Sequence, residues 1–550
     1  ARGADVQFYG TAAGVTSCYW DASLNRLKLH DGVKLNFGDG DDGDLYVGSD
    51  SVTYFRNQTG QIVIRAASDV YISDYAGNHR AGFRNDSSVD LYYDIENNST
   101  AKLSTTVDGI SVHGQVETAT QDFPDYRPRL NWNFASEKRL DPRITYTRTG
   151  QASYVDEFGI VQTVSDDQPR FDHDPLTGEC KGLLIEDQRT NQIKDSYNLV
   201  QQSWVPVNLN RRSFTTETLA PNGKYEATKL ILSTDANQHY TNHGNMTKAN
   251  GAERQCVSFW AKLTSSNYPI LKSYITGAGA FTNYSEARFN LSTGAVDGVS
   301  GSGGFTNHSV KMTKYPNGWY KCEYEATLNS SETTKRFQLL GNNGSANAGN
   351  GIDGYYIWGV QVEVGDFATS YIPTSTGQIV GASDSATQSQ VRGGDQVGML
   401  GDNHTNIWND QEGSYVIDYT PLERAAGNGV IIGSQRTTNG SGYPWPLYRH
   451  DAANSNVFKS YDLDHGIVTL SGTWADRREV WALGFNTTNG SIARNGTMLQ
   501  TNNTNMTGLT NVDQLWLGSS SSGSYYSMHL RRFMYYGKRL TKPQLQTMSQ

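Results

Sequence analysis

The N-terminal part of the chain alternates brief strand-forming runs with turns, and this pattern restricts the fold more than any other feature of the sequence. The runs recur about every ten residues. They are Val33–Phe37, Ser51–Arg56, Gln61–Arg65, Asp69–Ile72 and Val89–Tyr93. None is long enough to bury a hydrophobic core alone. A β-prism, a β-helix-like shaft or a small stacked sheet would suit the pattern, and association with identical chains is the economical way to stabilise it.

The composition predicts that the rest of the chain is also built from strands. Only 18% of the residues are charged, whereas the chain has 56 glycines and 32 tyrosines. Because glycine favours turns and tyrosine favours strands, this balance predicts an all-β protein with many short strands. The length also exceeds the usual domain size of about 100 to 200 residues, so we expect several domains.

Changes of pattern along the chain predict five segments. Prolines punctuate the second segment, which we expect to have little core of its own. The third and fifth segments show the period-two alternation of half-buried strands, and the Asn495-Gly496 pair and Thr541 predict a tight hairpin and the cap of a terminal helix. The segments are a β-rich shaft (1–118), a connector (119–194), a first β-sandwich (195–378), a polar linker (379–411) and a second β-sandwich (412–550).

The connector contains a long sequence segment that resembles a connector of phage virion proteins. Residues 169–191 read PRFDHDPLTGECKGLLIEDQRTN. In proteins of the tail-fibre and head-fibre type, a similar phrase joins an N-terminal shaft to C-terminal binding domains. Residues 354–365 resemble the closing strand of the sandwich that follows it. In the shaft, Val6–Thr11 and Trp20–Ser23 resemble attachment regions of marine and cyanobacterial phage fibres.

The resemblance implies a fold and a function. It implies a fibrous, β-prism-like shaft, a jelly-roll domain similar to carbohydrate-binding modules at 195–378, and a concanavalin A-like lectin domain at 412–550. The implied protein is a homotrimeric virion fibre, assembled in the host cytoplasm, that contacts other virion proteins through its N-terminal region and binds a host-surface polysaccharide for adsorption. A tailspike-like polysaccharide depolymerase and a purely structural head fibre or decoration protein stay open as alternatives.

Charge and hydropathy exclude two kinds of partner. The formal net charge of -9 would repel a phosphate backbone, so we expect no nucleic acid. The sequence has no run of about 18 apolar residues, so we expect no membrane insertion.

One stretch of the second sandwich has the residue types that bind sugars. An aromatic ring stacks on the apolar face of a pyranose, and nearby polar groups bond its hydroxyls. The predicted carbohydrate-binding residues are Tyr443, Trp445, Tyr448, Arg449 and Trp474. The alternative is that Trp445 and Trp474 lie in a core or in a trimer interface.

The evidence for metal or catalysis is weaker. An acidic run containing Asp39, Asp41, Asp42 and Asp44 could bind calcium, but Gly43 stands where an EF-hand loop needs a ligand, so a solvated acidic turn is the default. We expect no other cofactor. The chain has no E-x-D-x-x-E strand and no G-x-S-x-G elbow, so we predict no catalytic residues and an adhesive rather than an enzymatic role.

The histidines and cysteines are expected to be structural. His239 and His243 have the spacing of a zinc-binding helix but lack its glutamate, and we interpret them as loop residues. Cys256 and Cys322 fall in predicted strands of one sandwich. A disulfide between them is an alternative, but two buried thiols are the expectation.

Overall fold

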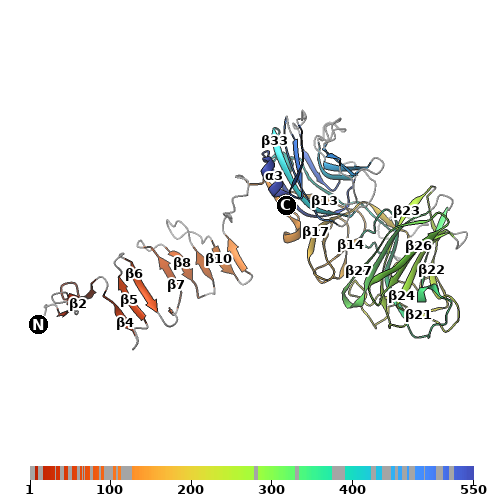
Figure 1. Cartoon of the computed structure of the whole chain (residues 1–550), viewed down its shortest axis with the longest axis horizontal. Coiled ribbons are helices and arrows are strands. Elements are labelled where there is room, and N and C mark those ends of the chain that lie inside the picture. The colour runs from red at the N-terminus through yellow and green to blue at the C-terminus, as the bar shows by residue number, and fades with distance from the viewer. Residues whose placement is uncertain are drawn as a thin grey trace. The chain divides into compact units, whose positions relative to one another are not determined.

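The computed structural model divides the chain into two compact units, residues 1–121 and residues 122–550 (Figure 1). The structure describes residues 6–9, 16–30, 33–37, 43–47, 52–57, 62, 64, 66, 68–74, 79–85, 88–91, 103–106, 109–112, 127–374 except 213, 250, 278–282 and 329–332, and 390–550 except 423–428, 436–446, 452–455, 461–467, 470–476, 488–489, 503–511 and 520–524. Almost all of the regular structure is antiparallel β, as the sequence predicted. None of the helices among these residues has the length and apolar character to cross a bilayer.

The first unit consists of short strands in three small antiparallel sheets. Within each sheet, every strand pairs with the next strand in the sequence. Brief strands separated by turns favour this arrangement. The strands are β1 (Val6–Tyr9), β2 (Thr16–Asp21) and β3 (Arg26–Leu29) in one sheet, β4 (Leu35–Phe37), β5 (Gly43–Val47) and β6 (Thr53–Asn57) in the next, and β7 (Val70–Ser73), β8 (His79–Phe83), β9 (Val89–Leu91), β10 (Leu103–Thr106) and β11 (Gly109–Val112) in the third.

One face of the second sheet carries a row of apolar side chains that are exposed among the described residues. Leu35, Leu45 and Phe55 lie directly opposite one another on β4, β5 and β6, and they are 45%, 39% and 59% exposed. Buried apolar surface is the main source of stability in a small sheet. In the described part of the chain, this row therefore contributes little buried apolar surface to the stability of the sheet.

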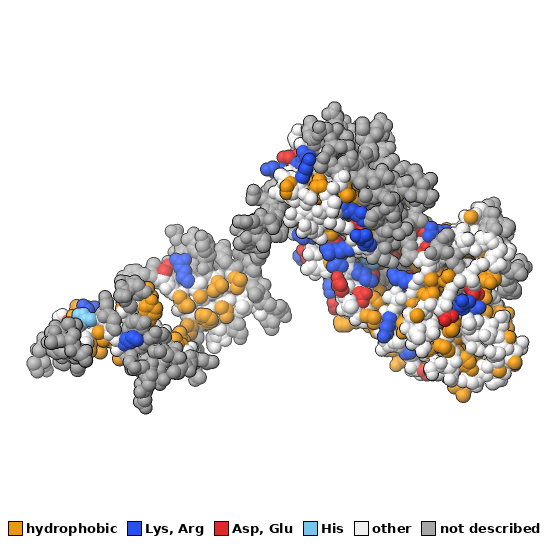
Figure 2. Space-filling model, in the orientation of Figure 1, with side chains coloured by type: hydrophobic (Ala, Val, Ile, Leu, Met, Phe, Trp, Pro, Cys, Tyr) orange, Lys and Arg blue, Asp and Glu red, His pale blue; other side chains and the backbone are white. Residues whose placement is uncertain are grey.

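The third sheet repeats this arrangement. Ile72, Phe83 and Leu91 lie on one face of β7, β8 and β9 and are 58%, 48% and 47% exposed. Figure 2 shows apolar side chains gathered over these strands. Among the residues described before residue 127, no apolar side chain is buried.

The first sandwich, in the second unit, packs two six-stranded antiparallel sheets face to face, which confirms the predicted sandwich at this position. One sheet has the order β19 (Trp204–Val207), β22 (Tyr240–Thr247), β29 (Thr334–Leu340), β24 (Ile270–Gly277), β25 (Tyr284–Asn290) and β26 (Ala295–Ser302). The other has the order β20 (Leu209–Arg212), β21 (Thr228–Leu232), β30 (Gly354–Val364), β23 (Glu253–Leu263), β28 (Tyr320–Leu328) and β27 (Thr306–Lys314). Alternate side chains of both sheets fill a common core that includes Val257, Phe259, Phe289 and Phe337.

The second sandwich also consists of two sheets. The larger contains β12 (Leu130–Asn133), β16 (Phe171–His173), β17 (Cys180–Ile185), β33 (Glu412–Pro421), β38 (Glu479–Asn486), β39 (Gly490–Arg494), β40 (Thr497–Asn502) and β42 (Met528–Tyr536). The smaller contains β13 (Thr145–Thr147), β32 (Gln396–Leu400), β34 (Gly429–Gln435), β35 (Leu447–Asp451), β36 (Asn456–Ser460), β37 (Val468–Thr469) and β41 (Gln514–Leu517).

Short elements complete the second unit. Two further strand pairs are β14 (Ala152–Val155) with β15 (Val161–Val164) and β18 (Arg189–Asn191) with β31 (Gln390–Arg392). The helices are α1 (Phe134–Glu137), η1 (Pro316–Gly318), η2 (Asn342–Gly344), α2 (Asp402–Thr405) and α3 (Lys542–Met548).

The predicted connector and linker are wrong as separate segments. Strands β12 and β17, from the segment 119–194, both pair with β42 near the C-terminus, and β13 pairs with β32 from the segment 379–411. Their apolar residues, including Leu130 and Ile185, belong to the same core as Trp481. The second sandwich is therefore closed by strands that lie on both sides of the first one in the sequence.

Several local predictions are confirmed. Asn495 and Gly496 have positive φ and connect β39 to β40, and Thr541 caps α3 in a capping box with Gln544. All four cysteines are free, and Cys256 and Cys322 are buried. The interpretation as loop residues is confirmed for His239, which precedes β22, and is wrong for His243. Both are buried, and His243 lies within β22, where its ring nitrogens contact backbone groups.

Candidate functional site

The outward face of the first sandwich carries aromatic and charged side chains on neighbouring strands. Side chains alternate along a strand. Ile275 and Phe289 therefore enter the core, whereas the alternate residues on the same two strands point away from it. We call the outward residues Lys272, Tyr274, Tyr284, Glu286 and Arg288 the tyrosine face. They come from β24 and β25, which pair so that Tyr274 lies opposite Glu286.

The tyrosine face is held in one arrangement by direct contacts. The rings of Tyr274 and Tyr284 have centroids 5.2 Å apart, and Lys272 Nζ lies 5.2 Å from the centroid of Tyr274. Glu286 contacts Lys272 Nζ at 3.3 Å through Oε2 and Arg288 Nη1 at 3.0 Å through Oε1. Rings and cations are therefore ordered before any ligand arrives, which reduces the entropy lost on binding.

The protonation states of the tyrosine face follow from these contacts. Burial and the hydrogen bond to Glu286 raise the pKa of Tyr274, so its hydroxyl stays protonated. Burial acts to raise the pKa of Glu286, but hydrogen bonds from Tyr274 and Ser300 and the charge of Lys272 outweigh it, and the pKa lies below its usual value. The face presents two phenols and two partly exposed cations, which can stack on a sugar ring and bond its hydroxyls, while the buried carboxylate of Glu286 holds the cations in place.

Sequence reasoning missed the tyrosine face, although a signal for it exists. The stretches Lys272–Tyr274 and Tyr284–Arg288 both place aromatic or charged residues at every second position, with inward-facing residues between them. The residues that were predicted to bind sugar cannot be compared with it. Tyr443, Trp445 and Trp474 lie outside the described residues, and Tyr448 and Arg449 lie in β35, where their side chains are not described.

The side chains of the predicted calcium-binding residues are not described either. Asp39, Asp41 and Asp42 lie outside the described residues, and Asp44 lies in β5 without a described side chain. Within the described part of the chain, no three acidic, histidine or cysteine side chains form a group that could hold a metal ion.

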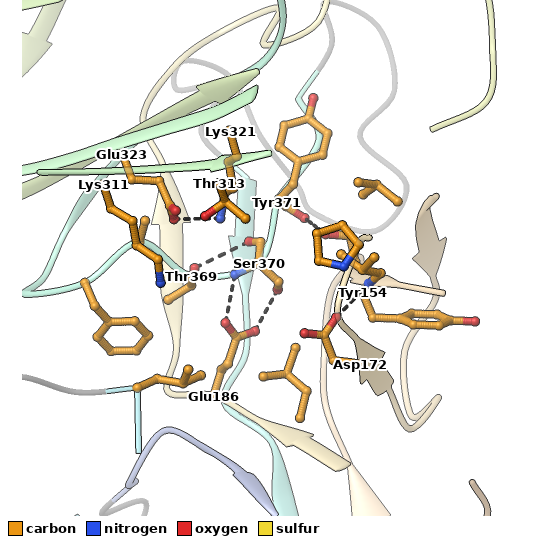
Figure 3. Close-up of a pocket in the computed structure, with 18 of the residues that line it drawn as sticks. Tyr154, Asp172, Glu186, Lys311, Thr313, Lys321, Glu323, Thr369, Ser370 and Tyr371 are labelled. Carbon is orange, nitrogen blue, oxygen red and sulfur yellow. Dashed lines mark hydrogen bonds and ion pairs between the residues drawn. The ribbon is translucent and has the colours of Figure 1, made fainter. Parts of the chain in front are cut away.

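A crevice of about 330 Å³ lies where β27 and β28 of the first sandwich meet residues from both ends of the second (Figure 3). Lys321 and Glu323 of β28 lie along it with their Nζ and Oε1 atoms 2.8 Å apart. Asp172 lines another side and contacts His529 Nε2 at 2.9 Å. Burial acts to raise the pKa of Asp172, but the hydrogen bond with His529 outweighs this effect and keeps the pKa of Asp172 below its usual value. Ion pairs of this kind suit the binding of polar groups more than proton donation.

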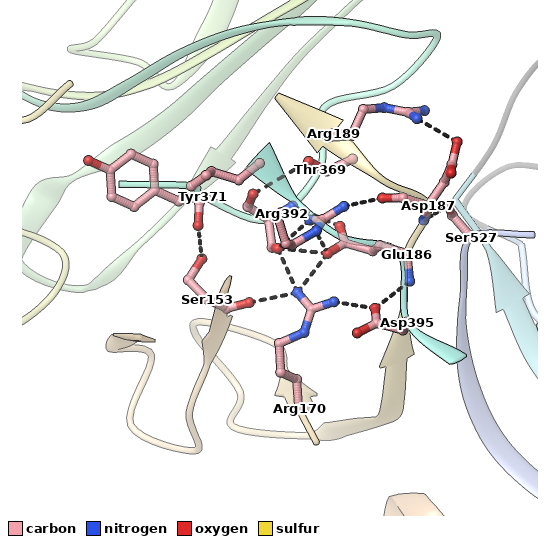
Figure 4. A network of polar contacts seen from close by, with 12 residues as sticks. Ser153, Arg170, Glu186, Asp187, Arg189, Thr369, Tyr371, Arg392, Asp395 and Ser527 are labelled. Carbon is pink, nitrogen blue, oxygen red and sulfur yellow. Dashed lines mark hydrogen bonds and ion pairs between the residues drawn. The ribbon is translucent and has the colours of Figure 1, made fainter. Parts of the chain in front are cut away.

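A buried ion cluster lies beside the crevice and joins the two sandwiches (Figure 4). Arg170 contacts Glu186 at 2.6 Å and Asp395 at 2.5 Å, and Arg392 contacts Glu186 at 2.6 Å. Ser370, which follows the last strand of the first sandwich, donates to Glu186 from its backbone N–H at 2.8 Å and from its hydroxyl at 2.6 Å. The arginine charges keep the pKa of Glu186 low against the effect of burial. The cluster fixes the walls of the crevice relative to each other.

Comparisons with known proteins give only distant structural similarities. No protein-family model and no curated protein matches the chain. Among solved structures, a carbohydrate-binding module (CBM40) of a Ruminococcus gnavus sialidase, bound to sialyllactose, is 18% identical and covers 27% of this chain and 88% of its own, with a TM-score of 0.22. Domain 4 of an extracellular arabinanase from Geobacillus stearothermophilus, in complex with arabinotriose, is 12% identical over 28% of this chain and 73% of its own, with a TM-score of 0.22. Trypanosoma rangeli sialidase is 9% identical over 59% of this chain and 60% of its own, with a TM-score of 0.25. Similarity at this level does not establish a common function.

Proposed function

We propose that the protein is a phage fibre that adheres to a host-surface glycan through the tyrosine face. Glycan binding is supported by one observation above all. The rings of Tyr274 and Tyr284 form an ordered pair beside Lys272, Glu286 and Arg288. Aromatic rings with charged groups at their edges match the alternation of apolar ring faces and hydroxyls on a sugar. The resemblance of residues 169–191 to phage connectors supports the virion part.

The first unit supports a fibre because two of its sheets expose apolar rows among the described residues. Further copies of the same chain would bury Leu35, Leu45 and Phe55 on one sheet and Ile72, Phe83 and Leu91 on the next. Identical chains present identical faces, so a closed symmetric assembly buries them all. The resemblance to phage fibres favours three copies, with the N-terminal region attached to other virion proteins.

The proposed mechanism is adhesion by several weak contacts. A sugar stacked on an open sheet face binds modestly, because it stays partly solvated. Several copies on one fibre raise the overall affinity without any new contact.

Binding of the full-length protein to host cells and to their purified polysaccharide tests the proposal. The wild-type protein should bind, and the Tyr274→Ala, Tyr284→Ala double variant should lose most of the binding. Tyr225→Ala is the matched control, because Tyr225 is 51% exposed elsewhere on the same sandwich. Equal binding by the double variant would rule out the tyrosine face, and absence of wild-type binding would rule out the adhesive role. Immunolabelling of virions tests the place on the particle.

The crevice favours a depolymerase as a second candidate, because Asp172 and Glu323 line the same cavity. Paired carboxylates on a sugar-sized cavity can hydrolyse a glycosidic bond when one of them donates a proton. The hydrogen bond with His529 keeps the pKa of Asp172 low, so Glu323 would have to be the donor. Release of oligosaccharide from host polysaccharide, abolished by Asp172→Asn or Glu323→Gln, would establish this function. Wild-type protein that binds polysaccharide without releasing fragments would exclude it.

A further inference from the structure

Three polar side chains with complementary reactivity meet inside the first sandwich, apart from the sites described above. Glu253 and Gln255 lie two positions apart on β23, and Lys335 lies on β29 of the opposite sheet. Lys335 and Gln255 are 0% exposed, and Glu253 is 8% exposed. Val257 and Phe337, the next inward residues of the two strands, belong to the hydrophobic core.

One carboxylate oxygen connects the amine to the carboxamide. Lys335 Nζ lies 2.8 Å from Glu253 Oε1, and Gln255 Nε2 donates to the same oxygen. The two nitrogens are therefore within two hydrogen-bond lengths of each other. Gln255 Oε1 is buried and has no hydrogen-bond partner among the described residues, so the carboxamide is held only through its Nε2.

Burial favours the neutral amine of Lys335. Lys248 is 3% exposed and donates to the carbonyl oxygens of Ala249 and Gly251, so a second ammonium group shares the surroundings of Glu253. Burial lowers the pKa of Lys335 to about 8, with Lys248 acting in the same direction and Glu253 against it. A buried lysine of this kind is a nucleophile at moderate pH.

We propose that Lys335 and Gln255 form an intramolecular isopeptide bond that joins the two sheets of the first sandwich. The neutral Nζ attacks Gln255 Cδ, and a new N–C bond forms. Glu253 accepts the proton that Nζ loses and delivers it to Nε2. The Cδ–Nε2 bond then breaks and ammonia leaves, so that the amine and carboxamide become one secondary amide and Glu253 is regenerated. No oxidant, reductant or further reactant takes part.

The bond would give the sandwich a covalent link between β23 and β29, two strands that belong to different sheets and are not paired through their backbones. Glu253 is the catalytic residue of this step, and the exclusion of water by the core favours aminolysis over hydrolysis. The inference does not depend on glycan binding or on the place of the protein in a virion.

Intact-mass spectrometry of the full-length protein, unfolded under reducing conditions, tests the inference. The wild-type mass should lie below the sequence mass by one ammonia molecule, and a proteolytic digest should contain the peptides of Gln255 and Lys335 joined together. Lys335→Arg and Glu253→Gln should both have the full mass, whereas Lys229→Arg, which changes a lysine paired with Glu217 on the same sandwich, should keep the deficit.

Two results would overturn the inference. A wild-type protein of full sequence mass would show that Lys335 and Glu253 form only an ion pair. A mass deficit that persists in Lys335→Arg would assign the lost ammonia to another reaction, such as cyclisation at an asparagine. The wild-type measurement needs no folded variant, and circular dichroism of the variants shows whether they retain the β fold.

Discussion

Arg170 Nη2 lies 2.5 Å from Asp395 Oδ2, and neither side chain is exposed, although 225 positions separate the two residues in the sequence. The whole first sandwich lies between them in the chain. Arg170 also contacts Glu186, which accepts hydrogen bonds from Ser370 at the end of that sandwich. The pair therefore connects the chain before the first sandwich to the chain after it, so we expect the two sandwiches to unfold together.

Replacement of Asp395 by alanine should destabilise both sandwiches. The change leaves the Arg170 guanidinium buried without one of its anionic partners, which typically costs about 3–5 kcal/mol. Urea unfolding followed by tryptophan fluorescence measures the loss. Arg139→Ala is the control, because its contact with Glu137 is exposed and should contribute less than about 1 kcal/mol. Equal effects of the two variants would contradict the role of the cluster.

The stability of the second unit should fall as the pH falls below the ordinary pKa of histidine. His243 Nε2 accepts a hydrogen bond from the Lys194 backbone N–H at 2.9 Å while Nδ1 faces the Gly244 carbonyl oxygen at 3.2 Å, so one neutral tautomer satisfies both contacts. Burial lowers the pKa of His243 from 6.5 to about 4. Between these values the unfolded chain binds a proton that the folded chain does not. Neutral His243 therefore makes its full contribution to the free energy of unfolding above pH 6.5. This contribution decreases by roughly 3 kcal/mol as the pH falls through the pKa of His243 in the folded protein.

The variant His243→Gln checks this assignment. Glutamine can donate and accept but does not titrate, so the free energy of unfolding should depend less steeply on pH in the variant. The slope should not vanish, because burial also lowers the pKa of His404 to about 4. Urea unfolding across this pH range gives both slopes, and identical slopes would mean that His243 does not contribute.

Gly182 should tolerate no side chain. Its φ is +104°, and a Cβ at this position would collide with the backbone carbonyl oxygen of Leu530 on the neighbouring strand β42. Gly182→Ala should therefore disrupt the pairing of β17 with β42 and lower the thermal midpoint by many degrees. Gly401→Ala is the matched control, because Gly401 also has positive φ but open space around it, so only backbone strain of about 1–3 kcal/mol is expected. Similar midpoints for the two variants would contradict the steric argument.

Self-association of the first unit should depend on one face of each sheet. Phe55→Asp places a charge in the exposed apolar row of β4, β5 and β6, and it should reduce the assembled fraction in analytical ultracentrifugation. Tyr54→Asp places the same charge on the opposite face of the same strand and should have a smaller effect. An unchanged mass for Phe55→Asp, or a monomeric wild-type protein, would contradict the proposed cover by identical copies.

Local features were predictable because neighbouring residues decide them. Most of the brief runs in the first unit predicted short strands, although the described residues Ile62 and Ile64 of the run Gln61–Arg65 lie in no strand. The Asn495-Gly496 pair predicted its hairpin, and Thr541 predicted the start of α3. Each of these depends on backbone preferences within a few residues. The alternation that exposes Tyr274 and Tyr284 is equally local, but alternation alone does not tell which polar face of a strand binds a ligand.

The sequence by itself determined that this chain is β throughout, where its hairpins turn and where its last helix begins, since steric preferences and hydrogen bonds over a few residues settle these features. Only the tertiary structure decided that β17 pairs with β42 and that Arg170 meets Asp395. Many strands of this chain have similar edges and alternation, so no local pattern identifies the partner of a given strand. The partner is selected by the joint burial of apolar side chains and ion pairs from distant segments, and that burial exists only in the folded protein.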